Sequence, residues 1–184
     1  MQNPIFITGN RSKADYLNQY LGIELDHQKV NQTEIQSLDL HEVVEHKARK
    51  AYELIQKPVL VDDSSLEFEA FGRFPGTFIR FLVDEVSHET ICRSLDSLSR
   101  KATRRAVMCL YDGSKVVFFD AISRGSVADH PSGSGGYGWD DFFIPDGWSK
   151  TRADMDDDEY KATYIQLEAF AQLREYLASS DAKM

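Results

Sequence analysis

The chain has few cysteines, no excess of basic charge and no long apolar run, and each shortage excludes a class of protein. Only Cys92 and Cys109 occur among 184 residues, both inside apolar segments, so neither a zinc site nor a disulfide framework is indicated. Lys and Arg number 21 against 30 Asp and Glu, and a net charge of −9 argues against a basic surface for a nucleic acid polymer. Without a signal-peptide pattern or an apolar run of membrane-spanning length, we expect a cytoplasmic protein with no membrane partner.

The rest of the composition is that of an ordinary globular protein. Hydrophobic residues make up 42% and charged residues 28% of the chain, and 184 residues suffice for a single domain, 1–184, with two lobes. Apolar spacing predicts alternating strands and helices, and hence an α/β fold. The expected strands are 4–8, 23–30, 58–61 with 66–71, and a hairpin over 106–123; the expected helices follow Asn10 and cover 39–56, 77–82, 87–98 and 161–178.

Two adjacent carboxylates follow a short apolar run at Pro58–Val61. The pattern predicts a buried strand that ends at Asp62 and Asp63, followed by Ser64. Open α/β sheets place their chemistry at such strand ends. Adjacent carboxylates can hold Mg²⁺, or pair a metal ligand with a general base, but Asp and Ser are also ordinary turn residues. This stretch alone leaves both interpretations open.

A second polar group follows the first expected strand. Thr8, Gly9 and Asn10 form a tight turn into a helix, and Lys13 lies one turn into that helix. Free N–H groups, a favourable dipole and a mobile cation together make a phosphate cradle, although a strand-to-helix turn with an incidental lysine looks the same. Lys47 beside a buried helix face and Arg80 among apolar residues are either cations for an anionic ligand or solvated side chains.

A glycine-rich loop occupies residues 131–148. Residues 133–138 match the dinucleotide fingerprint G-x-G-x-x-G, but no helix is expected after the last glycine, so we reject that interpretation. The loop instead presents Tyr137, Trp139 and Asp140, which suit stacking on a base and hydrogen bonding to base or ribose. The acidic run 154–159 is more typical of a solvated loop than of a metal site.

Taken in order, five segments resemble the inosine/xanthosine triphosphate pyrophosphatases. Residues 8–13 resemble the motif T-G-N-x-x-K, residues 34–39 resemble the metal-binding glutamate loop, and Lys47-Ala48 resembles the helix that carries the family lysine. Residues 62–66 resemble D-D-S-G-L, and residues 74–80 resemble the P-G-x-x-x-[KR] that follows it. Residues 136–140 resemble G-[FY]-G-[WY]-D, residues 145–147 resemble P-x-G, and residues 154–155 resemble E-M. The likeness covers nearly the whole chain.

The resemblance implies a fold and a reaction. The fold is an elongated mixed sheet flanked by helices, in two lobes with a central cleft, in a homodimer. The reaction is Mg²⁺-dependent hydrolysis of a nucleoside triphosphate to monophosphate and pyrophosphate. The implied roles are metal binding by Glu34, Asp62 and Asp63; catalysis by Asp63, as base, and Lys47; triphosphate binding by Thr8, Gly9, Asn10, Lys13, Lys47 and Arg80; and nucleoside binding by Ser64, Tyr137, Gly138, Trp139 and Asp140.

The chain departs from the family near its C-terminus. Where the family has Ser-His-Arg, which reads the 6-oxo group of the base, this chain has residues Tyr164-Ile165-Gln166, and Tyr160 stands where a lysine is common. We therefore expect a base preference different from the 6-oxopurine standard, with Gln166 able to pair with an adenine-like edge or a modified base. Alternatively, Lys161 or Arg152 supplies the missing donor.

A second class of function is a catalytically weak nucleotide-binding or regulatory protein with the same fold. Such a protein is expected to have lost a base or a metal ligand. Glu34, Asp62, Asp63 and Lys47 are all present, so the enzyme is favoured.

Overall fold

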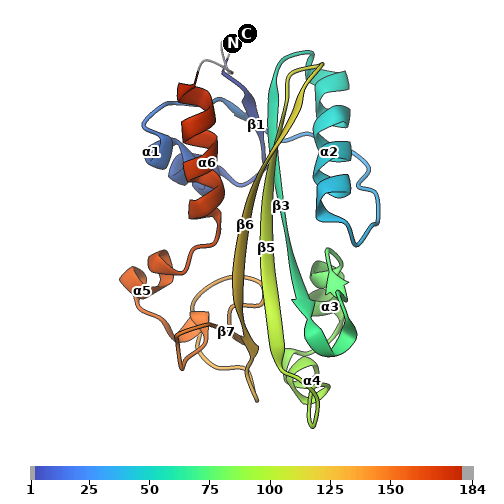
Figure 1. Ribbon diagram of the computed structural model, residues 1–184, viewed down its shortest axis with the longest axis vertical. Coiled ribbons are helices and arrows are strands. Elements are labelled where there is room, and N and C mark those ends of the chain that lie inside the picture. The colour runs from blue at the N-terminus through green and yellow to red at the C-terminus, as the bar shows by residue number, and fades with distance from the viewer. Residues whose placement is uncertain (1–2, 180–184) are drawn as a thin grey trace. The chain divides into compact units, whose positions relative to one another are not determined.

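The computed structural model describes residues 3–179, which form a mixed sheet with helices packed against it (Figure 1). The described part of the chain contains one seven-stranded sheet in the order β2-β1-β3-β5-β6-β7, with β4 paired to β3. The strands are β1 (Ile5–Ile7), β2 (His27–Gln28), β3 (Val59–Phe68), β4 (Pro75–Gly76), β5 (Lys101–Tyr111), β6 (Val116–Val127) and β7 (Phe143–Pro145). The helices are α1 (Arg11–Leu21), α2 (Leu40–Ile55), α3 (Ile79–Glu85), α4 (His88–Arg93), α5 (Asp157–Ala162) and α6 (Gln166–Ala178), with short 3₁₀ turns at Glu69–Phe71 and Arg152–Asp154.

The chain divides into two compact units, and three long strands contribute residues to both. Unit 1 comprises 1–63, 106–121 and 166–184, and unit 2 comprises 64–105 and 122–165. The division falls within β3, β5 and β6, so each of these strands carries side chains of both units.

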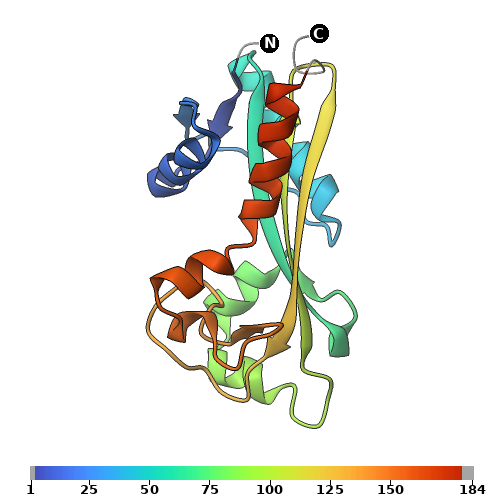
Figure 2. The ribbon, with the colours of Figure 1, turned by 60° about the vertical axis from the view of Figure 1, so that its left-hand side comes forward.

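Unit 1 is built around parallel strands. β1 pairs in parallel with β2, Phe6 opposite His27, and with β3, Ile5 opposite Val59. Helix α2 covers one face of the strands and helix α6 the other, as the two views show (Figures 1 and 2). Helix α1 lies beside α6, where Tyr16 and Tyr20 contact the Phe170 ring at centroid distances of 6.2 and 5.6 Å.

Helix α2 is amphipathic and capped at its start. The Asp39 side chain accepts hydrogen bonds from the amides of His41 and Glu42, which satisfies donors that the first helical turn leaves open. Its buried side chains pack onto β3 and β5 in one apolar cluster: Leu40, Val44, Ala48 and Ala51 against Val59, Val61, Val107 and Cys109. This packing fixes which side of α2 the sheet covers, and so where Lys47 points.

Unit 2 has its own apolar core. Side chains from β3, α3, α4, β5, β6 and the segment leading into β7 meet in it, and Trp139 packs against it: Leu66, Phe68, Ile79, Ile91, Cys92, Leu95, Ala102, Val127, Phe142 and Phe143. Strand β7 pairs antiparallel with β6, with Gly125 opposite Pro145. The loop 131–142 is thereby anchored to the sheet at its C-terminal end.

Several expected elements have different bounds in the structure. The strand expected to end at Asp62 and Asp63 runs on through Phe68, so the two expected strands are one. The helix expected over 161–178 is two helices, α5 and α6, with a break at residues 163–165. The acidic run 154–159 is not the expected solvated loop, because it contains the start of α5. Asp156 caps this helix in a capping box with Glu159, and the acids between them lie in its first turn. Among residues 3–179, no helix combines the length and apolarity that a membrane span requires.

Candidate active site

The paired aspartates lie in the middle of β3, where the buried pattern of the strand is interrupted. Val59–Val61 are buried, Asp62–Ser64 are half-buried, and Ser65 and Leu66 are buried again. Successive strand residues face opposite sides, so Asp62 and Asp63 point to different faces of the sheet. The prediction that both acids end the strand is wrong, but they remain the polar interruption of an apolar strand.

Asp62 is paired with Lys13 of α1. Their side chains form an ion pair, in which the Asp62 carboxylate is 8% and the Lys13 side chain 25% exposed. The sequence predicts that the Lys13 ammonium swings back to the helix start; the structure instead places it on a carboxylate of the neighbouring strand. Lys13 is therefore near the first turn of α1 but held by a partner in this state.

A side chain caps the start of α1. The Asn10 side chain accepts a hydrogen bond from the amide of Lys13 at 3.1 Å, and the Asn10 amide donates to Thr8 Oγ1 at 3.1 Å. These two bonds, together with Gly9, shape a tight exit from β1 into the helix. The positive end of α1 is thus presented next to Lys13.

Lys47 connects two carboxylates of unit 1. Its ammonium lies 2.8 Å from Glu34 Oε1 and 2.9 Å from Asp63 Oδ2, with only 17% of its side chain exposed. Burial lowers the pKa of Lys47, but the charges and hydrogen bonds of Asp63 and Glu34 outweigh burial, and the net shift is upward. Lys47 therefore stays charged at all physiological pH values.

The donor set around Lys47 fits a hard divalent cation. Within residues 3–179 no group of three or more His, Cys, Asp or Glu side chains is arranged to hold a metal by itself. Mg²⁺ commonly uses only one or two protein carboxylates, because phosphates and water complete its shell. Glu34 and Asp63, whose carboxylates meet at one ammonium, supply that number.

In unit 2, the predicted base-contacting loop is organised around a buried Asp140. Asp140 is 4% exposed. Its Oδ2 accepts hydrogen bonds from the Tyr137 amide at 2.9 Å and the Tyr160 hydroxyl at 2.7 Å, and its Oδ1 accepts from Arg152 Nε at 2.8 Å. The carboxylate therefore holds the loop in place from within, whereas the Tyr137 ring is 74% exposed.

Glycines permit the close turns of this loop. Gly136 has a φ of +78°, and a Cβ there would lie 2.6 Å from the Asp140 Cβ. Gly138 also has a left-handed φ of +66°, but with open space around it. Gly136 thus allows the backbone both to turn and to pass close to Asp140. Gly138 is required only for the left-handed backbone conformation of the turn.

Arg80 is brought to this loop. Its Nη1 donates to the Tyr137 hydroxyl at 2.9 Å, and its Nε donates to Asp84 at 2.6 Å within α3. Its side chain is 65% exposed. The predicted phosphate clamp therefore stands beside the most exposed aromatic ring of the loop.

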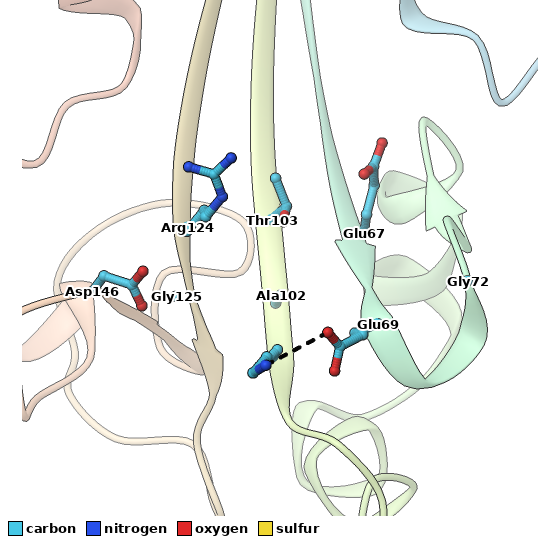
Figure 3. Close-up of a pocket in the computed structure, with 9 residues that line it drawn as sticks. Glu67, Glu69, Gly72, Ala102, Thr103, Arg124, Gly125 and Asp146 are labelled. Carbon is cyan, nitrogen blue, oxygen red and sulfur yellow. Dashed lines mark ion pairs between the residues drawn. The ribbon is translucent and has the colours of Figure 1, made fainter.

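A hollow in unit 2 is lined by none of these residues. It has a volume of about 520 Å³ and lies over β3, β5 and β6 (Figure 3). Its lining residues are Glu67, Glu69, Gly72, Lys101, Ala102, Thr103, Arg124, Gly125 and Asp146. Three carboxylates against two cations suit a triphosphate poorly, so we do not place the site there.

Known proteins with the same fold and sequence pattern identify the family. The family model described as the Ham1 family matches residues 4–176. The chain is 34% identical over 158 residues to the dITP/XTP pyrophosphatase of Thermococcus kodakarensis, covering 84% of this chain and 85% of that protein. It is 31% identical over 180 residues to the inosine triphosphate pyrophosphatase of Yarrowia lipolytica, covering 95% of each chain.

The chain belongs to the Ham1 family.

A solved HAM1 protein from Coxiella burnetii shares the fold, with a TM-score of 0.85 at 23% identity, over 96% of this chain and 98% of that one. The predicted family and the predicted mixed sheet flanked by helices are confirmed. The names of the relatives also support the prediction of a nucleoside-triphosphate diphosphatase.

The residues that depart from the Ham1 pattern fall in both units. Tyr164 and Ile165 close unit 2, with Ile165 buried, and Gln166 begins α6 in unit 1. The Gln166 Oε1 is buried and has no hydrogen-bond partner among the described residues. Its predicted role in base recognition stays a prediction. Ser64, half-buried in β3, likewise keeps its predicted role as a prediction.

Sequence reasoning missed Arg104 entirely. Arg104 lies in β5 and is 7% exposed, between Ala102 and Ala106 on the buried register of the strand. The signal was available: a cation at an alternate position between small apolar residues interrupts a period-two pattern. Arg152, considered only as a substitute donor, proves to be 1% exposed and paired with Asp140.

Proposed function

We propose that this chain is a nucleoside triphosphate pyrophosphatase that converts noncanonical or modified purine (deoxy)nucleoside triphosphates to monophosphate and pyrophosphate. The observation that carries the proposal is the cluster of unit 1 in which Glu34 and Asp63 share the Lys47 ammonium, with Lys13 and the start of α1 in the same unit. The pyrophosphatase names of its Ham1 relatives support it.

The triphosphate would be bound by the cations and amides of this cluster. Lys13, at the first turn of α1, can leave Asp62 for a phosphate oxygen without moving its helix, because only the side chain has to rotate. Lys47 adds a second cation within unit 1, and Arg80, which belongs to unit 2, is proposed as a further phosphate ligand on the family resemblance. A triphosphate carries several negative charges, so cations and helix amides together are the matching set.

Hydrolysis needs a positioned water more than a covalent nucleophile. In the proposed reaction Asp63 takes the proton of the attacking water at its carboxylate, the water oxygen bonds to phosphorus, and the anhydride bond between the α- and β-phosphates breaks. Lys47, hydrogen-bonded to Asp63, holds that carboxylate in orientation. Glu34 and Asp63 would hold Mg²⁺, which would supply charge neutralisation on the phosphate oxygens, whereas Asp62 faces the other side of the sheet and pairs with Lys13.

The nucleoside would be contacted by Ser64 and the Tyr137–Asp140 loop. Tyr137 offers an exposed ring for stacking, and Asp140 fixes the loop that carries it. With Tyr164-Ile165-Gln166 in place of Ser-His-Arg, the order of preference among purine bases is proposed to differ from that of enzymes for ITP and XTP. On the family resemblance we further propose a homodimer, and on the sequence composition a cytoplasmic location without nucleic acid polymer or membrane partners.

Asp63→Asn tests the proposal. The amide keeps the shape of the side chain but cannot take a proton, so pyrophosphate release from ITP should fall by about 10³-fold, while nucleotide binding in EDTA persists. Glu45→Gln is the matched control: Glu45 is an acid of unit 1 that pairs with Arg49 on the exposed side of α2. Undiminished turnover in Asp63→Asn would refute the assigned base. Binding without turnover in the wild-type chain would favour the nucleotide-binding alternative.

A further inference from the structure

Arg104 is a buried guanidinium with unused donors. Its side chain lies in β5, is 7% exposed, and its Nε and Nη1 are buried with no hydrogen-bond partner in the part of the chain that the structure describes. The guanidinium carbon lies 5.2 Å from the centroid of the Phe143 ring, which covers the face of the group but leaves Nε and Nη1, one donor on each of its two N–H edges, without an acceptor. Buried charged donors without partners are costly, and native proteins rarely keep them unless a ligand or water completes the bond.

The nearby charged groups do not complete it. Asp140 is the carboxylate of this network, and it already accepts from Arg152, Tyr160 and the Tyr137 amide. Arg152 is equally committed, because its Nη1 donates to the carbonyl oxygen of Thr163 at 2.6 Å and to the hydroxyl of the same residue. Arg152 therefore bridges Asp140 and Thr163, whereas Arg104 is the cation whose Nε and Nη1 have no hydrogen-bond partner among the described residues.

The network carries an excess positive charge. Arg104 and Arg152 face one carboxylate, that of Asp140, so one positive charge is uncompensated. Burial and the neighbouring Arg152 lower the pKa of Arg104 to about 10, which still leaves it charged at neutral pH. A ligand group that meets Arg104 must offer acceptors, and a partial or full negative charge there is favoured.

Arg104 also lies beside the loop to which we assign the base. Its guanidinium packs on Phe143, the first residue of β7, which directly follows the loop that bears Tyr137 and Trp139 and that Asp140 anchors. A guanidinium is a planar fork that matches two adjacent acceptors, and O6 with N7 of a 6-oxopurine is such a pair. A 6-aminopurine would turn its own N–H donor toward the donors of Arg104.

We propose that Arg104 selects the base in this chain by donating from Nη2 together with one of its two unpartnered donors, Nε or Nη1, to O6 and N7 of a 6-oxopurine nucleotide. The inference rests on the nucleotide hydrolysis proposed above. It gives the chain a donor from β5 in place of the histidine and arginine that its C-terminal segment lacks. The altered base preference then concerns which 6-oxopurine nucleotide is hydrolysed fastest. Nucleotides with a 6-oxo group remain favoured over those with a 6-amino group.

The test compares three substrates in three proteins. The proteins are the wild type, Arg104→Met and the control Arg105→Gln, whose arginine is 40% exposed and pairs with Glu67. The substrates are ITP, ATP and 7-deaza-ITP, which lacks the N7 acceptor. We expect the wild type to prefer ITP over ATP and to lose about 10-fold in kcat/KM on 7-deaza-ITP. In Arg104→Met the ITP/ATP ratio should fall by about 10- to 100-fold and the 7-deaza penalty should vanish, because one bidentate contact carries that much discrimination.

Two further measurements keep the outcome decisive. If Arg104→Met does not fold, Arg104→Lys keeps the charge but loses the fork, and its ITP/ATP ratio should still fall. An unchanged ratio in a folded Arg104 variant would overturn the inference and leave Arg104 a structural residue. If the wild type releases no pyrophosphate from any nucleotide, the proposed function fails, and calorimetric binding of ITP against ATP in EDTA then decides the role of Arg104 separately.

Discussion

Replacing Lys47 with methionine separates the electrostatic role of its ammonium from the packing of its stem. Methionine preserves an unbranched apolar side chain on α2 and removes the charge shared by Glu34 and Asp63. A charge-assisted hydrogen bond contributes about 1.5–3 kcal/mol when shielded. The Asp63 carboxylate is 30% exposed, so its bond to Lys47 should contribute close to that range. The Glu34 carboxylate is 57% exposed, so its pair with Lys47 is a surface ion pair worth less than about 1 kcal/mol.

The net destabilisation should therefore be modest and the catalytic loss large. Lys47 no longer has to be desolvated in the variant, which offsets part of the lost attraction, so we expect the free energy of unfolding to fall by about 1–2 kcal/mol. In catalysis the loss of one cation and of the orientation of Asp63 should cost about 3 kcal/mol of transition-state stabilisation, which is about 10²-fold in kcat/KM.

The assays are urea unfolding and pyrophosphate release at saturating Mg²⁺. Lys50→Met is the matched control, because Lys50 also lies on α2 but pairs with Glu53 at 2.7 Å in solvent. Because the pKa of Lys47 is raised on folding, its stabilisation is fully present below the unfolded value of about 10.4 and is lost only as pH rises through the higher folded value. The stability difference between wild type and Lys47→Met should thus be constant from pH 7 to 9. Full activity in Lys47→Met, or an effect equal to that of Lys50→Met, would refute the reasoning.

Three other perturbations have defined outcomes. Asp140→Asn leaves the buried Arg152 without its carboxylate, so calorimetry should show a loss of about 3 kcal/mol, and a change below about 1 kcal/mol would contradict the assignment of Asp140 as the anchor of the loop. Asp156→Ala removes the capping box of α5 and should cost about 1 kcal/mol in urea unfolding, whereas no change would show that the cap is not needed. Burial raises the thiol pKa of Cys92 to about 11 and of Cys109 to about 12, so iodoacetamide at pH 8 should label the unfolded chain far faster than the folded one; equal rates would exclude buried thiols.

The starts of the first two helices follow from local signals. Asn10 and Asp39 are strong caps placed before amphipathic stretches, and the observed helices begin directly after both. The break between α5 and α6 has no comparable signal, because the apolar spacing continues through residues 163–165. There the Thr163 carbonyl is taken by Arg152, a contact from a distant segment that no local pattern reveals.

In the candidate site, too, the sequence indicates some of the residues but not how they pair. Lys47, Asp62 and Asp63 stand out because polar residues interrupt or flank apolar elements, whereas Glu34 is indicated only by the family resemblance; the structure brings the ammonium of Lys47 to two of the three carboxylates. Arg80 was assigned to phosphate, but its partners in the structure are Asp84 and Tyr137. These pairings depend on where separate elements lie after folding, which spacing along one element cannot specify.

Base recognition was the least predictable part. The sequence shows that residues 164–166 lack a cation, but it does not show that Arg104 and Arg152 bring two guanidinium groups to one carboxylate. Burial of an arginine is decided by tertiary packing around it, here by Phe143 and Tyr160, whose rings lie 5.2 and 4.1 Å from the guanidinium carbons of Arg104 and Arg152.

The measurement that tests the central claim most directly is product analysis of the purified wild-type chain. ITP, XTP, dITP, N6-modified purine nucleotides and the common nucleotides are each incubated with the protein, with Mg²⁺ and with EDTA. We expect Mg²⁺-dependent release of one pyrophosphate per monophosphate, fastest for a noncanonical purine nucleotide and absent in EDTA. Release of inorganic phosphate with accumulation of diphosphate, or no turnover of any nucleotide, would contradict the account.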